Sequence, residues 1–239
     1  MNHRRQRSEG LSSFGHHWIL AIDSASRYSS VALMNHGEDV YLESIDQPLS
    51  ATLLLQRIDQ LLLRIDLAPT AIIALGFNCG PGSLTGARIG AAMIQGLAWG
   101  WGKPVVAVSS LEASAYSCWR NSGCEQDIEI QVLLPGGRDE LWYGAFVMDQ
   151  VGQPHPLVPE RLCRKDEIEL PRADCRLNGG GWDIIETWRK DFNHPRGYRT
   201  LCQVDATHFA ALTWQRWLNG SALEPEDAHP SAMQQPIIG

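Results

Sequence analysis

Residues 67–102 form the stretch that most limits what this chain can fold into, because Arg88 is the only charged residue among its 36 positions. The 20% charged content of the whole chain would place about seven there. Residues 71–77 resemble a buried strand, a glycine-rich loop follows over 80–90, and a helix apolar almost all round is expected over about 87–98. A buried strand followed by a buried helix predicts an α/β fold.

Amphipathic and strand-like segments flank this stretch. Residues 18–23, 30–34 and 40–44 predict three antiparallel strands in a meander. Ser50 can cap a helix over 51–66, whose apolar stripe suits docking on a sheet. Leu53 and Leu63 lie outside that stripe and Leu55 at its edge, which indicates a second contact. The remaining expected elements are strands at 105–108, 128–134 and 142–147 and helices at 110–120, 182–190 and 206–218.

The 239-residue chain is expected to form two α/β lobes that meet near residue 120. We assign residues 1–17 to a disordered polar extension, 18–120 to the first lobe and 121–220 to the second. Residues 221–239 form a tail that we expect to pack back on the first lobe. No window is long and apolar enough for a membrane span and no secretory signal precedes the first strand, so a cytoplasmic protein is expected.

Composition excludes some function classes. A net charge of −7 argues against a protein that binds nucleic acid alone, because phosphate binding depends on lysine and arginine. The six cysteines lack metal-binding spacing and suggest reduced thiols, and no histidine pair presents two ligands on one helix face. No hydrolase motif is present, and Cys79 lacks the local pattern of a nucleophile. Asp139 and Glu140 are either general acids or, as we favour, solvated turn charges.

Each of three features allows two interpretations. The glycine loop either cradles a phosphate at a helix N-terminus or lets the helix approach another segment closely, and it matches neither the Walker nor the dinucleotide pattern. Asp23, Ser24 and Ser26 either face a nucleotide phosphate or its metal ion, or satisfy the backbone of a turn. Trp99 and Trp101 are either core anchors or interface residues.

The order of these motifs resembles that of one protein family. Residues 19–25 (ILAIDSA), 30–33 (SVAL), 80–90 (GPGSLTGARIG) and 95–98 (QGLA) are similar to the TsaB (YeaZ) family of bacterial accessory proteins for threonylcarbamoyladenosine synthesis on tRNA. The resemblance covers roughly residues 18–115. It implies an actin-like (ASKHA, ribonuclease H-like) fold whose two lobes contain mixed, five-stranded-type sheets flanked by helices. The family is a degenerate paralogue of the catalytic subunit TsaD.

The resemblance also implies a function without catalysis of its own. A family member dimerises with a TsaD-like transferase, activates it for modification of adenosine 37 of tRNA, contacts a TsaE-like ATPase and also forms homodimers. Contact with tRNA then comes mainly through the complex. No tightly bound cofactor and no metal are implied, although ATP or ADP with Mg²⁺ at the subunit junction is compatible. The degenerate phosphate loop corresponds to Asp23, Ser24 and Ser26.

Carried over by position, the pairing helices are residues 51–66 and 84–99. The implied interface residues are Leu53, Leu55, Ile58, Leu62, Leu63, Ile89, Met93 and Leu97. The structural motif comprises Gly80, Pro81, Gly82, Ser83, Thr85, Gly86, Arg88 and Gly90.

The chain departs from the family at residues 135–138, at 229–233 and at Ser50. The alternative function is an ATP-binding enzyme of the same fold that transfers a phosphoryl or carbamoyl group, with Asp23 and residues 179–181 around the nucleotide. A protease, which the family's older glycoprotease name suggests, conflicts with the missing metal ligands and nucleophile.

Overall fold

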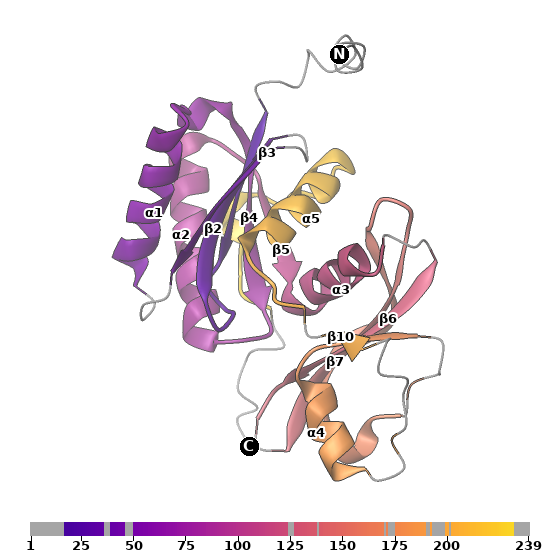
Figure 1. The fold of residues 1–239 in the computed structure, drawn as a ribbon. Coiled ribbons are helices and arrows are strands. Elements are labelled where there is room, and N and C mark those ends of the chain that lie inside the picture. Colours follow the sequence, from indigo (N-terminus) through magenta and orange to yellow (C-terminus); the bar gives the residue numbers. More distant parts are fainter. Residues whose placement is uncertain are drawn as a thin grey trace.

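The structure is a computed structural model that describes residues 17–35, 39–45, 50–123, 127–137, 139–169, 171, 175–189, 192, 199–200 and 202–231. The expected extension (apart from residue 17), the turn at 36–37, Arg138 and the last eight residues of the tail lie outside the described residues. Within them, two sheets are flanked by helices (Figure 1).

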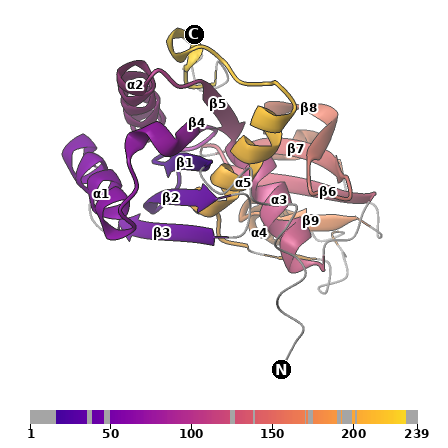
Figure 2. The same ribbon diagram turned by 90° about the horizontal axis from the view of Figure 1, so that it is seen from above.

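The first sheet contains five strands in the order β3-β2-β1-β4-β5. Its strands are β1 (Trp18–Asp23), β2 (Ser29–Asn35), β3 (Asp39–Ile45), β4 (Ile72–Gly80) and β5 (Val105–Ser109). The first three form the expected antiparallel meander, whereas β4 pairs in parallel with both β1 and β5. Helices α1 (Ala51–Arg64) and α2 (Leu84–Trp101) lie side by side on one face of this sheet (Figures 1 and 2).

Local chemistry sets where these two helices begin and end. The Ser50 side chain caps α1 by accepting from the Leu53 amide. The Ser83 hydroxyl accepts from the Gly86 amide at 3.1 Å, so α2 begins at Leu84, three residues earlier than the apolar pattern alone predicts. Gly102 ends α2 in the left-handed conformation, with φ of 63°. The loop expected over 80–90 is therefore short, and most of it is the first two turns of α2.

The second sheet also contains five strands, in the order β10-β9-β6-β7-β8. Its strands are β6 (Ile128–Pro135), β7 (Glu140–Met148), β8 (Pro154–Arg164), β9 (Arg176–Asn178) and β10 (Arg199–Thr200). Starting from β8, this order repeats that of the first sheet: an antiparallel meander followed by two parallel strands. The chain thus builds the same sheet twice, although its sequence contains no recognisable repeat.

Strand β8 is absent from the sequence-based expectation. Its eleven residues include Pro154, Pro156 and Pro159, which usually indicate loops. An edge strand tolerates proline because one side of its backbone has no neighbour to bond, and β8 is the edge of the second sheet. The two short strands β9 and β10 were also not expected.

Two helices pack on the sheet of the opposite lobe. Helix α3 (Ser110–Asn121) follows β5 of the first sheet but packs on β6 and β7 of the second. Helix α5 (Ala206–Leu218) follows β10 of the second sheet but packs on β1, β2 and β4 of the first, opposite α1 and α2 (Figure 2). The boundary expected near residue 120 therefore separates the strands but not these helices. Helix α4 (Gly181–Trp188) stays with the second sheet.

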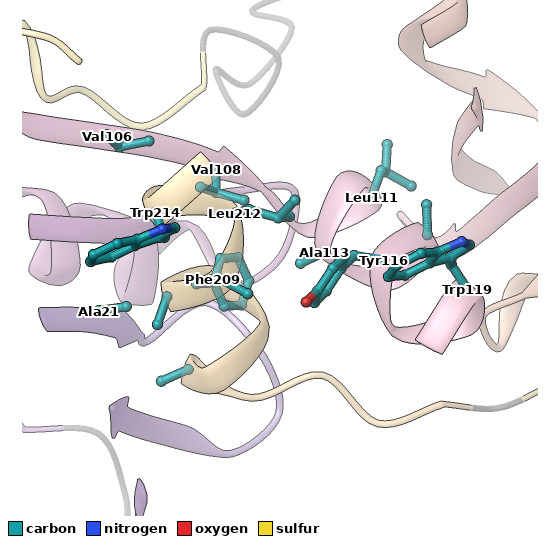
Figure 3. Close-up of a cluster of buried hydrophobic side chains, with 14 of the residues drawn as sticks. Ala21, Val106, Val108, Leu111, Ala113, Tyr116, Trp119, Phe209, Leu212 and Trp214 are labelled. Carbon is teal, nitrogen blue, oxygen red and sulfur yellow. The ribbon is translucent and has the colours of Figure 1, made fainter. Parts of the chain in front are cut away.

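The exchanged helices join the lobes through one hydrophobic cluster. Figure 3 shows the buried side chains of α5, among them Phe209 and Leu212, next to those of α3, among them Leu111 and Tyr116. The cluster extends into both sheets, for example to Ala21 in β1 and Ile130 in β6. Because an apolar cluster of this size resists exposure to water, it fixes the two lobes against each other.

The described part of the tail packs on the first lobe. Leu223 forms a backbone bridge with Val105 of β5, and Ala228 is fully buried against α2 and the first sheet. The Gln95 side chain donates to the Glu226 carbonyl, and the Ser231 amide donates to the Cys79 carbonyl at 2.8 Å. The tail therefore covers the exposed edge of β5.

Candidate functional site

A cleft of about 740 Å³ lies between the two lobes and is the first candidate site. The first lobe lines it with Ser26, Arg27 and Tyr28, and the second with Trp142, Gly179 and Gly180. Asp205, which caps α5, also lines it, and its hydrogen bonds with His208 and Thr207 hold its pKa at about 2 despite partial burial. A volume of this size suits a small ligand, so the polar groups in and next to its lining decide what can bind there.

Asp23 organises the turn between β1 and β2. One carboxylate oxygen, Oδ1, accepts from the amides of Ala25 and Ser26 at 3.2 and 3.1 Å and from the Asn78 side chain at 2.8 Å. Its other oxygen is buried without a hydrogen-bond partner among the described residues. Full burial raises the pKa of this carboxyl, which disfavours the charged form that a metal ion would need. The contacts favour the turn interpretation of Asp23.

The glycine loop is filled by that same turn. The Ser83 amide donates to the Ala25 carbonyl at 2.8 Å, and the Ser24 hydroxyl donates to the Gly86 carbonyl at 2.8 Å. The Gly86 amide donates to the Ser83 hydroxyl at 3.1 Å. The amides of Ser83 and Gly86, two of the groups that could hold a phosphate, are therefore already bonded within the protein.

The spacing of the glycines follows from this contact. A Cβ at Gly82 would lie 2.4 Å from the Ala25 carbonyl oxygen, and one at Gly86 would lie 1.9 Å from that of Ser24. A Cβ at Gly90 would lie 2.3 Å from the Ser24 hydroxyl. The three glycines thus face the β1–β2 turn, Gly82 from just before α2 and Gly86 and Gly90 from its first two turns. The geometry favours close packing over a phosphate cradle.

The nucleotide implied by the fold fits these residues poorly. A magnesium nucleotide needs cations or free amides around its phosphates. Arg27 is the only cationic side chain among the described residues that line the cleft, and the amides of Ser83 and Gly86 in the glycine loop are already bonded within the protein. We therefore derive no reaction step through a nucleotide in this cleft.

The other candidate reactive groups offer no catalytic arrangement. Burial raises the pKa of the Cys79 thiol to about 12, so its nucleophilic thiolate is negligible at neutral pH. Asp139 is exposed and bonds Lys165 at 2.7 Å, which lowers the pKa of its carboxyl, and Glu140 is also exposed. Within the described ranges, no three histidine, cysteine or acidic residues cluster in a way that could hold a metal ion.

The outer surface of α1 and α2 is the second candidate site, which we call the helix face. It carries Leu55 and Leu63 on α1 and Ala92, Gly96 and Trp99 on α2. Leu63 is 80% exposed and Trp99 70%, the largest fractions among the large hydrophobic side chains of the described residues, and Leu55 is 43% exposed. Each helix leads into the start of a parallel strand, so the two run in the same direction and Leu63 and Trp99 lie at corresponding ends. Exposed apolar residues so grouped indicate a protein-binding surface.

The structure changes the expected membership of this face. Ile58 and Leu62 are not available for a partner, because their side chains belong to the core beneath α1. Leu53, Ile89, Met93 and Leu97 are half-buried and rest on that core. The sequence allowed Trp99 and Trp101 to be either core anchors or interface residues. The exposure of Trp99 favours the interface, whereas Trp101 packs on the core. Thr85 and Arg88 are exposed on α2, and Pro81 is buried at the cleft.

The repeated sheets, the exchanged helices and the cleft between the lobes define an actin-like (ASKHA) protein. The family model for TsaD, described as tRNA N6-adenosine threonylcarbamoyltransferase, matches residues 48–186, and TsaB of Escherichia coli is 33% identical over 170 residues. The chain belongs to the TsaB (YeaZ) family.

Other comparisons agree with this assignment. The alignment with the E. coli relative covers 71% of this chain and 71% of the relative, which is named tRNA threonylcarbamoyladenosine biosynthesis protein TsaB. The relative of the same name from Haemophilus influenzae is 28% identical, with 69% of this chain and 72% of the relative covered. The solved structure of YeaZ from Pseudomonas aeruginosa superposes with a TM-score of 0.77 at 28% identity, covering 90% of this chain and 98% of that one. The expected fold class is thereby confirmed.

Membrane insertion by a helix finds no support in the part of the chain that the structure describes. None of its helices combines the length and the hydrophobicity needed to cross a bilayer.

Proposed function

We propose that this chain is a non-catalytic subunit in the formation of N6-threonylcarbamoyladenosine on tRNA, and that it binds and activates a TsaD-like transferase through the helix face. The observation that carries the proposal is the exposure of Leu63 and Trp99 on adjacent parallel helices. The names of the relatives supply the pathway. The poor fit of the cleft to a magnesium nucleotide supports a subunit without chemistry of its own.

Several further features belong to the proposal. A TsaE-like ATPase is expected to join the pair, and ATP or ADP with Mg²⁺ to bind, if at all, at the subunit junction and not in the cleft of this chain. With a net charge of −7, the chain should contact tRNA mainly through its partner. The same helix face would support a homodimer when no transferase is present. The proposed location is the cytoplasm.

Replacing Leu63 with aspartate should separate the chain from its partner. In the free protein the substitution should change stability by less than about 0.5 kcal/mol, because the side chain is 80% exposed. In the complex it would bury an unpaired charge, which costs several kcal/mol. Size-exclusion chromatography with a TsaD-like partner should therefore give two separate peaks.

The matched control is Leu218→Asp. Leu218 is also an exposed leucine near a helix end, but α5 lies on the opposite face of the first sheet. This variant should elute as an intact complex. An intact complex with Leu63→Asp at wild-type affinity would remove the helix face as the binding surface.

Calorimetric titration of the isolated chain with Mg-ATP tests the non-catalytic assignment. We expect millimolar or undetectable affinity, because the glycine loop donates to the β1–β2 turn and Arg27 alone supplies positive charge in the described lining. Micromolar affinity accompanied by turnover would instead support the alternative ATP-dependent enzyme.

A further inference from the structure

The junction between the lobes contains two carboxylates that share one serine. Ser109 ends β5 and caps α3, at the point where the chain leaves the first sheet. Its amide donates to Glu112 Oε2 at 3.0 Å, and its hydroxyl donates to Glu160 Oε2 at 2.8 Å. Glu160 belongs to β8, the edge strand of the second sheet. This hydrogen bond therefore ties the second lobe to the start of α3.

The charges around Ser109 do not balance. Arg216 of α5 bonds to Glu112 and also donates to the Ala107 carbonyl, so its guanidinium is already engaged. Glu160 makes no ion pair within the described residues. The groups that face it are Glu112 from α3, Arg216 from α5 and the Cys79 thiol from β4. Two acids and one base leave one excess negative charge at the junction unless a proton is bound.

Burial and the nearby Glu112 both favour a proton on Glu160. Burial is the larger cause and Glu112 the second, and together they raise the pKa of Glu160 to about 7 against the opposing hydrogen bond from Ser109 and attraction of Arg216. The Cys79 thiol remains neutral because its pKa is about 12. Glu160 thus changes charge near neutral pH, whereas the Cys79 thiol stays neutral.

We propose that Glu160 is a proton-linked latch between the lobes, which holds β8 against the β5–α3 junction when neutral and loosens that contact when ionised. The neutral acid keeps the Ser109 hydrogen bond without repelling Glu112. The ionised acid faces Glu112 in a poorly hydrated position, so the contact opens to admit water. The latch acts on the contact between β8 and the β5–α3 junction and does not depend on the proposed partner.

The linkage sign follows from the direction of the shift. A carboxyl whose pKa is higher in the folded chain than in the unfolded chain binds its proton more tightly when folded. Its contribution is therefore fully present below about pH 4.5, the ordinary value for glutamate, and is lost as the pH rises through about 7. Glu160→Gln, which is neutral at every pH, should retain the latched contact throughout.

The decisive experiment titrates the wild-type chain and uses a variant only to assign the signal. In protein carrying ¹³C at the glutamate carboxyl carbons, the Glu160 signal, assigned by its loss in Glu160→Gln, should titrate with a midpoint near 7. A midpoint below 5 would overturn the proposal. Hydrogen exchange of the amides at the start of α3 should quicken between pH 6 and 8 in the wild type beyond its intrinsic pH dependence. An unchanged protection over that range would also overturn it.

A variant comparison provides the second test. The urea midpoint of Glu160→Gln, relative to wild type, should increase as the pH rises from 5 to 8. The matched control is Glu169→Gln, which removes an exposed carboxylate from the same lobe and should show no such trend. A difference between Glu160→Gln and wild type that stays constant with pH would contradict the latch.

Discussion

Replacing Gly86 with alanine should lower the free energy of unfolding by about 3 kcal/mol or more. The added Cβ would lie 1.9 Å from the Ser24 carbonyl oxygen and 2.8 Å from its carbonyl carbon. Backbone atoms cannot rotate away as a flexible side chain could, so either α2 or the β1–β2 turn must move. That movement would break the hydrogen bond from Ser24 to the Gly86 carbonyl. Urea denaturation monitored by tryptophan fluorescence measures the loss.

Gly96→Ala is the matched control for this prediction. Gly96 lies in the same helix, but a Cβ built there meets nothing within 4 Å. Alanine should therefore stabilise the helix by about 0.5–1 kcal/mol through its higher propensity. If Gly86→Ala unfolded at the same urea concentration as wild type, the close contact between α2 and the β1–β2 turn would be wrong.

Replacing Gly96 with arginine should strongly weaken binding to the transferase while the chain still folds. The position is exposed on α2 and has open space around it, so the isolated protein should tolerate a long side chain. Gly96 lies between Ala92 and Trp99 on the helix face, where small residues allow a partner helix to approach. An arginine there should weaken the complex at least about 100-fold, equivalent to about 2.7 kcal/mol.

Surface plasmon resonance with an immobilised TsaD-like partner measures this change. Thr187→Arg is the control, because it adds the same charge to an exposed position of α4 in the second lobe. The control should bind as the wild type does. Wild-type affinity for Gly96→Arg would mean that the partner does not pack closely on this part of α2.

The first lobe could be predicted largely from local patterns. Alternation, turn signals and a capping serine placed β1, β2, β3 and α1 within one or two residues of their observed ends. Helix α5 was predicted at its observed bounds, and the structure shows that Asp205 caps it. These features depend on residues close in sequence, which is why a single chain suffices to find them.

The second lobe was harder because its signals conflict. The prolines of β8 by themselves indicate a loop. The segment forms an edge strand only because it pairs with the neighbouring strand β7. The short strands β9 and β10 likewise form only by pairing within that sheet, β9 with β6 and β10 with β9. No local pattern reports whether a partner strand is present.

The functional residues were predicted with mixed success for the same reason. Apolar excess on α1 pointed to Leu55 and Leu63, which are exposed. Ile58 and Leu62 lie in the apolar stripe that periodicity assigns to the sheet, so their burial contradicts only the interface list carried over from the family. Glu160 was missed altogether, since nothing in the sequence around β8 indicates that it meets Ser109, 51 positions earlier. A half-buried glutamate in a strand of mostly exposed residues carries no local signature.

The sequence by itself determined the α/β class, the strand–loop–helix unit over about residues 71–98 and the family, because each rests on the order and spacing of neighbouring residues. Only the tertiary structure decided what the glycines are for. Gly82, Gly86 and Gly90 could have surrounded a phosphate, but the β1–β2 turn, some sixty residues earlier, occupies that space. Two segments so far apart come together only when the sheet forms, so whether a loop is open or filled is a property of the packed fold.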